Sequence, residues 1–134
     1  MSFSAKKVLV VEDSAPFRSL LQLVLESLGV EEIVEVGNGV EAIQALKTFK
    51  ADLVVMDWMM PDMDGIECTH LIRLTGGVPI VMVTARDSAI DIETAIAAGA
   101  NAYVVKPVSI KRMMASILTA VNSHSFDHPL AVIA

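Results

Sequence analysis

The chain has 134 residues, of which 54% are hydrophobic and 19% are charged, and its formal net charge is −6. This length suits one domain with a single core, and the apolar content excludes a largely disordered chain. The negative charge argues against nonspecific binding to DNA or to anionic membranes.

Short apolar runs and helical patterns alternate five times along the sequence. In chain order, the expected strands are 8–11, 32–37, 53–56, 80–83 and 103–106, and the expected helices are 17–28, 40–46, 66–74, 88–98 and 110–121. Ser14 is a possible cap of the first helix, while Gly29 and Gly99 mark the ends of the first and fourth helices.

The strand runs differ from one another in their polar pattern. Four of them are rich in β-branched residues and do not alternate with polar residues, which is typical of strands buried on both faces of a parallel sheet. The run at 32–37 alternates and fits an edge strand. Each connection is long enough for a right-handed βαβ crossover. The predicted fold class is therefore α/β, with helices on both faces of the sheet.

We expect a cytoplasmic protein that does not enter a membrane. The first apolar run is short and is followed by two acids, so it does not form a signal peptide. All apolar runs are far shorter than the roughly 20 residues of a membrane-spanning helix. Cys68 is the only cysteine, which excludes an internal disulfide and fits a reducing compartment.

Polar side chains stand where the buried strands end. Glu12 and Asp13 end the first strand, Asp57 the third, Thr84 the fourth and Lys106 the fifth. Taken singly, such residues are more often helix caps, strand residues or turn residues. The carboxyl ends of the strands of an open α/β sheet lie together, however, and ligands bind outside them. We therefore predict one site assembled from several strands.

The predicted site holds three acids and one lysine, which leaves an excess of negative charge. Two carboxylates about 4 Å apart repel each other by roughly 4 kcal/mol at an effective dielectric constant near 20. A divalent cation would balance them, and a few oxygen ligands open to water favour Mg²⁺ over Ca²⁺. Such a site could bind phosphoryl oxygens, and a carboxylate could itself be the nucleophile that forms an aspartyl phosphate.

Four stretches of the sequence resemble the receiver domains of two-component response regulators. They are VLVVEDS with the acid pair, VVMDWMMPDMDGIE around Asp57, VPIVMVTA with Thr84, and GANAYVVKP with Lys106. The resemblance covers about residues 5–123. It implies a flavodoxin-like, doubly wound parallel sheet of order 2-1-3-4-5 with five helices. We expect residues 1–123 to form the receiver domain and 124–134 to form a flexible C-terminal tail, because this stretch follows the last predicted helix and contains a proline.

The resemblance implies a phosphoacceptor and a set of Mg²⁺ ligands. Asp57 would accept the phosphoryl group. The ion would be held by Asp13, by Asp57, by the backbone carbonyl of Met59 and, through water, by Glu12. We therefore expect a signalling protein rather than an enzyme, with self-phosphorylation and self-dephosphorylation at Asp57.

The resemblance also assigns residues to a switch. Lys106 would pair with a phosphoryl oxygen, Thr84 would donate a hydrogen bond to the phosphoryl group, and Tyr103 would move inward with Thr84. The bond between Lys106 and Pro107 would be cis, which is a minority state even before proline.

Residues in and near the loop after Asp57 have further implied roles. Pro61 and Gly65 would shape the loop so that it lends its carbonyl and then turns into a helix. Met59 and Arg86 occupy the positions that tune dephosphorylation in the family. Met59 would shield the phosphorus, because its thioether cannot orient a water, and Arg86 would pair with a phosphoryl oxygen. Slow self-dephosphorylation is the expected result.

The implied partners are two proteins. A sensor histidine kinase or a histidine phosphotransfer protein would donate the phosphoryl group. Because the sequence ends soon after the fifth predicted helix, we expect output through binding of a protein partner, on the surface made by 88–98, 103–106 and 110–121. No nucleic acid or membrane partner is expected.

Alternatives from other classes fit the motifs less well. A receiver-like interaction module that works without phosphorylation stays open, although such modules usually lack one of the five site residues. A haloacid-type phosphatase would need an acid at Met59. A flavin mononucleotide carrier would place phosphate beside Glu12 and Asp13, which repel it. A dinucleotide site would need the motif G-x-G-x-x-G, which the sequence lacks.

Overall fold

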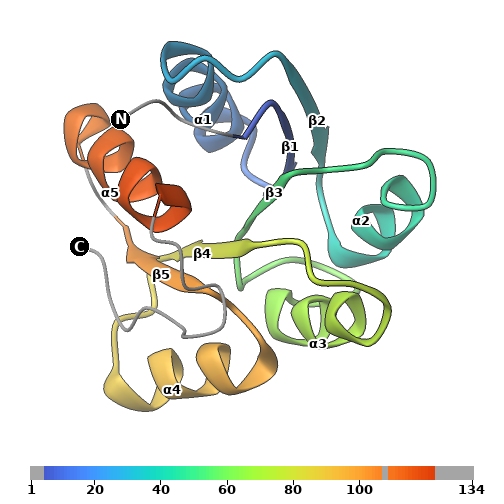
Figure 1. Cartoon of the computed structure of the whole chain (residues 1–134). Helices are drawn as coiled ribbons and strands as arrows, with labels where there is room; N and C mark the ends of the chain where they lie inside the picture. The colour runs from blue at the N-terminus through green and yellow to red at the C-terminus, as the bar shows by residue number, and fades with distance from the viewer. Residues whose placement is uncertain (1–4, 107–108, 123–134) are drawn as a thin grey trace.

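A computed structural model describes residues 5–106 and 109–122 of the chain, in which strands and helices alternate from β1 to α5 (Figure 1). The strands are β1 (Lys7–Val11), β2 (Glu32–Val36), β3 (Leu53–Met56), β4 (Ile80–Thr84) and β5 (Ala102–Val105). The helices are α1 (Ala15–Ser27), α2 (Gly39–Ala45), α3 (Gly65–Thr75), α4 (Ala89–Ala98) and α5 (Ile110–Asn122). Across the described ranges, the search for a helix with the length and hydropathy of a membrane span found none. The predicted tail, 124–134, lies outside the described residues.

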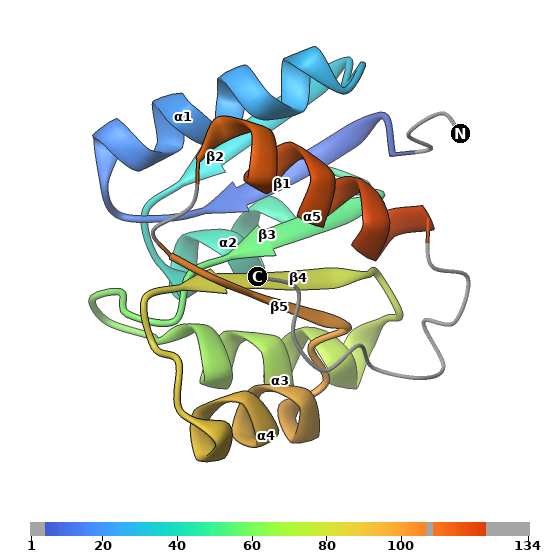
Figure 2. The same cartoon turned by 90° about the vertical axis from the view of Figure 1, so that its left-hand side faces the viewer.

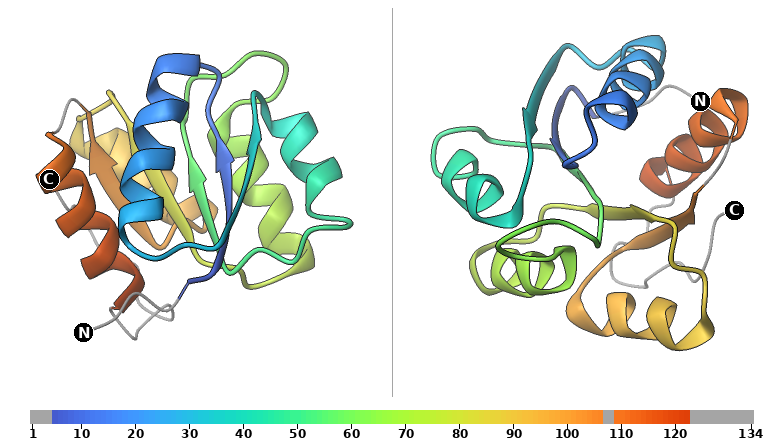
Figure 3. Two further views of the ribbon diagram at one scale, coloured as in Figure 1. Left: turned by 90° about the horizontal axis from the view of Figure 1, so that it is seen from above. Right: turned by 180° about the vertical axis from the view of Figure 1, so that it is seen from behind.

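The five strands form one parallel sheet of order β2-β1-β3-β4-β5 (Figure 3). The predicted α/β fold class and the strand order implied by the resemblance are both confirmed. β2 lies at one edge of the sheet, as its alternating sequence indicated, and it is less buried than the central strand β3. The parallel arrangement places the carboxyl ends of all five strands on the same side of the molecule.

Side chains of each inner strand alternate between two apolar cores, one on each face of the sheet. In β1, Val8 and Val10 join the core under α1 and α5, whereas Leu9 and Val11 join the core under α2, α3 and α4. Figure 2 shows α1 and α5 on one side of the sheet and α3 and α4 on the other. Burial on both faces is the physical reason why the inner strands lack polar alternation.

The predicted ends of two helices are present in the structure. The Ser14 hydroxyl caps α1 by accepting a hydrogen bond from the Phe17 amide at 3.4 Å. Gly99 follows α4 with a φ of 118°, a left-handed conformation that favours glycine.

The end of α4 is also tied to α3 and to the sheet through Arg73. The Nε atom of Arg73 donates to the Gly99 carbonyl oxygen at 2.9 Å, and Nη2 donates to Asn101 Oδ1 at 2.6 Å. Asn101 Oδ1 also accepts from the Ile80 amide at 2.8 Å. Burial lowers the pKa of Arg73, as expected for a cation surrounded by protein. This network joins α3, β4 and the connection between α4 and β5 at the end of the sheet opposite the carboxyl ends of the strands.

Candidate functional site

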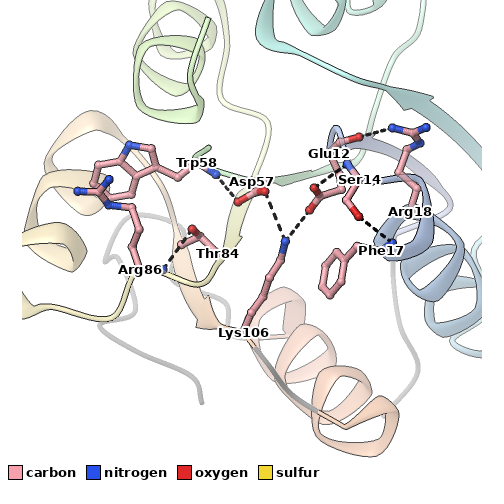
Figure 4. A network of polar contacts seen from close by, with 9 residues as sticks. All are labelled: Glu12, Ser14, Phe17, Arg18, Asp57, Trp58, Thr84, Arg86 and Lys106. Carbon is pink, nitrogen blue, oxygen red and sulfur yellow. Dashed lines mark hydrogen bonds and ion pairs between the residues drawn. The ribbon is translucent and has the colours of Figure 1, made fainter. Parts of the chain in front are cut away.

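The carboxyl ends of four strands carry the polar residues that were predicted to form a site (Figure 4). Glu12 follows β1, Asp57 follows β3, Thr84 is the last residue of β4 and Lys106 follows β5. The ladder hydrogen bonds continue past three of these strands, and past β1 the Glu12 amide donates to the Val36 carbonyl at 3.0 Å. The Asp57 amide donates to the Val11 carbonyl at 2.9 Å, and the Lys106 amide donates to the Thr84 carbonyl at 2.8 Å. The side chains are therefore positioned by the sheet itself.

Three acids converge at this edge. One carboxylate oxygen from each of Glu12, Asp13 and Asp57 lies within 4.8 Å of the others. Glu12 and Asp57 are 2% and 7% exposed, whereas Asp13 is open to solvent. Burial raises the pKa of Glu12; the hydrogen bond from Lys106 opposes this rise, and the charge of Asp57 adds to it.

Lys106 provides a cation to two of these acids. Its Nζ atom lies 2.8 Å from Glu12 Oε1 and 3.4 Å from Asp57 Oδ2, and it also lies 3.9 Å from the centroid of the Phe17 ring. One ammonium shared between two carboxylates leaves the three-acid cluster with excess negative charge. The donors are all oxygens and one of them is solvent-exposed, so the cluster fits a hard divalent cation that keeps part of its water, such as Mg²⁺.

The loop between β3 and α3 is folded tightly against Asp57. Asp57 Oδ1 accepts from the Trp58 amide at 2.7 Å, and the Trp58 carbonyl accepts from the Gly65 amide at 2.8 Å. The Pro61 carbonyl accepts from the Met63 amide at 2.7 Å. A Cβ atom at Gly65 would lie 2.1 Å from the Asp57 carbonyl oxygen, so this position has room only for glycine.

Thr84 and Tyr103 are connected through the backbone of Arg86. Both side chains are buried, with 0% exposure. Thr84 Oγ1 accepts from the Arg86 amide at 3.4 Å, and the Tyr103 hydroxyl donates to the Arg86 carbonyl at 2.8 Å. Burial raises the pKa of Tyr103 to about 12, which keeps its hydroxyl protonated as a donor. Tyr103 thus occupies the inward position in this structure, and its movement with Thr84 stays a prediction.

The Arg86 side chain lies against neighbours of Asp57. Nη2 pairs with Asp91 Oδ1 at 3.0 Å, Nη1 contacts Met59 Sδ at 3.5 Å, and the guanidinium carbon lies 4.3 Å from the centroid of the Trp58 ring. Figure 4 shows the guanidinium over this ring rather than directed at Asp57. The hydrogen bond and charge of Asp91 raise the pKa of Arg86, and the hydrogen bond from Arg86 lowers the pKa of Asp91.

Sequence reasoning did not single out Phe17, Trp58 or Asp91 as residues of this region. Phe17 and Asp91 lie in the first turns of α1 and α4, the helices that start beside the site, and Trp58 directly follows Asp57. Their positions were a usable signal, because side chains in these turns face the carboxyl edge of the sheet. The bond between Lys106 and Pro107 cannot be compared with its predicted cis form, because Pro107 lies outside the described residues.

Comparison with known families agrees with the fold and with the acid cluster. The model of the response regulator receiver domain matches residues 8–118. Among curated proteins, the DNA-binding response regulator MtrA of Mycobacterium tuberculosis is 32% identical over 134 residues, covering 100% of this chain and 58% of the relative. The protein of the same name from Mycobacterium leprae is 33% identical over 129 residues, covering 96% of this chain and 56% of the relative. The chain thus spans little more than half the length of these relatives.

Solved structures of similar chains share this fold over most of the chain. The chemotaxis response regulator CheY4 of Vibrio cholerae has a TM-score of 0.81 and 27% sequence identity, and the match covers 87% of this chain and 99% of that chain. The receiver domain of the Francisella response regulator 1452 has a TM-score of 0.78 and 27% identity, covering 87% and 96% of the two chains.

Proposed function

The chain belongs to the response regulator receiver domain family, and from this premise we propose that Asp57 accepts a phosphoryl group from a phosphohistidine donor. The donor would be a sensor histidine kinase or a histidine phosphotransfer protein. The observation that carries the proposal is the position of the Asp57 carboxylate, which is grouped with those of Glu12 and Asp13 within 4.8 Å and lies 3.4 Å from the Lys106 ammonium.

The transfer would be a direct displacement at phosphorus. An Asp57 carboxylate oxygen forms the new bond to phosphorus while the bond between phosphorus and the donor's imidazole nitrogen breaks, and the electron pair of that bond stays on the nitrogen. Lys106 is already placed beside Asp57 and can pair with a phosphoryl oxygen. Thr84, at the end of β4, would donate its hydroxyl hydrogen to another phosphoryl oxygen.

The acid cluster is suited to hold Mg²⁺ during this transfer. We expect Asp13 and Asp57 to bind the ion directly, with the Met59 backbone carbonyl as a further ligand and Glu12 acting through water. Bound there, the ion would compensate the negative charge that builds up when a phosphoryl group approaches three carboxylates.

The output would be a change in partner binding on the face formed by α4, β5 and α5. Among the described side chains of these helices, two large apolar ones are exposed: Ile90 on α4 is 75% exposed and Ile110 on α5 is 43% exposed. Shifting a population from 1:99 to 99:1 requires about 5.5 kcal/mol. A hydrogen bond to a charged group contributes about 1.5–3 kcal/mol, so Thr84 alone would not complete the switch. Lys106 and the bound partner would supply the remainder.

Labelling by a small phosphodonor tests the role of Asp57. Incubation with radiolabelled acetyl phosphate and Mg²⁺ is expected to place one phosphoryl group on each chain, and EDTA is expected to prevent this. Asp57→Asn should lose the label, because an amide does not attack phosphorus. Asp62→Asn is the matched control: it removes an acid from the same loop, where φ is 68°, a conformation that asparagine tolerates. Label that persists in Asp57→Asn would contradict the proposal.

Partner affinity tests the switch. A protein partner would be captured in the presence of beryllium fluoride, a mimic of the phosphoryl group. It is expected to bind roughly tenfold more tightly with the mimic than without it, since coupling energies of about 1–3 kcal/mol correspond to changes in affinity of about 5–150-fold. The affinity would be measured by calorimetry on purified components. Asp57→Ala should bind equally in both conditions. Equal affinities for the parent protein would exclude coupling between phosphorylation and binding.

A further inference from the structure

The side chain of Arg86 joins the two loops that flank Asp57. Arg86 belongs to the loop between β4 and α4, and its guanidinium pairs with Asp91 in the first turn of α4. The same group lies over the ring of Trp58 and contacts Met59, both in the loop after Asp57. Its position is therefore fixed by one ion pair, one ring contact and one weak sulfur contact.

The ion pair between Arg86 and Asp91 is weak enough to be exchanged for another partner. The side chains of Arg86 and Asp91 are 40% and 19% exposed, and exposed ion pairs contribute little to stability. The Nε atom of Arg86 is buried and has no hydrogen-bond partner in the part of the chain that the structure describes. A competing anion could therefore displace Asp91 from the guanidinium.

A phosphoryl group on Asp57 would be such an anion. It carries about −1.5 to −2 charges and three strong acceptor oxygens, more than one carboxylate offers. Trp58, on which the guanidinium rests, is the next residue after Asp57, and the Arg86 amide already contacts Thr84 Oγ1 at 3.4 Å. Asp91 and a phosphoryl group on Asp57 would therefore compete for the same guanidinium.

We propose that Asp91 is a positioning residue that sets the lifetime of the phosphoryl group by holding Arg86 against Trp58 and away from Asp57. The inference rests on the proposed role of Asp57 as phosphoacceptor. An Arg86 side chain that is released from Asp91 pairs with a phosphoryl oxygen, which stabilises the phosphorylated state and obstructs the approach of water. Asp91 thus opposes the protection of the phosphoryl group by Arg86.

The test is the decay of radiolabelled phosphoprotein after removal of the phosphodonor. Asp91→Asn is expected to slow the decay by about threefold or more. Asp91→Glu keeps the charge and should decay close to the parent rate. Glu93→Gln is the matched control, because it removes an exposed acid from the same helix without touching the Arg86 pair. In an Arg86→Met background, Asp91→Asn should have no effect on the rate, since its partner is absent.

Fluorescence adds a readout that a purely structural role would not change. Trp58 is the only tryptophan of the chain and lies under the Arg86 guanidinium. Beryllium fluoride is expected to change Trp58 emission more in Asp91→Asn than in Glu93→Gln, because without the Asp91 carboxylate Arg86 leaves the ring more readily. Thermal melts would show that both variants fold.

The outcomes separate this inference from the function on which it rests. A labelled parent whose decay is unaffected or accelerated by Asp91→Asn overturns the role of Asp91 and leaves Asp57 as phosphoacceptor. The same holds if Glu93→Gln slows the decay equally, because the effect is then one of net charge. A parent that takes no label contradicts the role of Asp57 and this inference with it.

Discussion

Replacing Gly65 with alanine is expected to lower the free energy of unfolding by roughly 3 kcal/mol, near the upper end of single substitutions. The added Cβ would lie 2.1 Å from the Asp57 carbonyl oxygen and 2.9 Å from both the Asp57 carbonyl carbon and the Trp58 Cα atom. All three atoms are backbone, so relief requires the β3–α3 loop to move. The hydrogen bond from the Gly65 amide to the Trp58 carbonyl would be distorted by the same movement.

Urea unfolding of two alanine variants would measure this effect. Gly77→Ala is the matched control, because an added Cβ at Gly77 meets no atom within 4 Å. Its free energy of unfolding should stay within about 0.5 kcal/mol of the parent value. Since the displaced backbone carries Asp57, Gly65→Ala should also reduce labelling by acetyl phosphate. Equal stabilities of the two variants would show that the loop can adjust without cost.

Magnesium is expected to stabilise the folded protein strongly. At a free concentration about 100 times the dissociation constant, a ligand that binds only the native state adds about 2.7 kcal/mol. For a domain of this size, this corresponds to a rise in Tm of roughly 10 °C.

In EDTA at neutral pH, the raised pKa of Glu12 lowers the stability of the folded protein, because the buried carboxylate is charged there. A raised pKa contributes stability below the unfolded value of 4.5 and loses it as the pH rises through the folded value.

Thermal melts in EDTA and in Mg²⁺ test this expectation with one variant of the cluster. Asp13→Asn should melt at a higher temperature than the parent in EDTA, because it removes one of three converging charges, and it should lose most of the response to Mg²⁺. Glu26→Gln, an exposed position on α1, should respond like the parent. An equal rise in Tm for Asp13→Asn and the parent would place the metal elsewhere.

The fold could be predicted from the sequence because its signals are local. Runs such as 53–56 are apolar without alternation, and this pattern reports burial on both faces before any tertiary contact is known. The convergence of residues after β1 and β3 then follows from parallel topology alone. The edge position of β2 could be predicted for the same reason, since the polar residues within this strand indicate exposure to solvent.

The surroundings of the site could not be predicted in the same way. The pairing of Arg86 with a phosphoryl oxygen stays a prediction, but the contacts of its guanidinium with Trp58 and Asp91 were not foreseen from the sequence. Which of several nearby partners a long side chain chooses depends on loop geometry, and neither propensity nor periodicity encodes that choice. The positive φ of Asp62, at 68°, is a similar case: the tight turn imposes it on a residue that only tolerates it.

The contacts at the two ends of α4 differ in strength, so we expect this helix to rotate about its C-terminal end at Gly99. At Gly99 the helix is clamped by Arg73, whose guanidinium is partly buried, whereas Asp91 at the other end is held by the exposed pair with Arg86. A helix of 10 residues is about 15 Å long, so a rotation of about 10° around Gly99 would displace its first turn by roughly 2–3 Å. Displacement grows with distance from Gly99, so Ile90, a large exposed apolar residue of that first turn, would move nearly as far as the start of the helix.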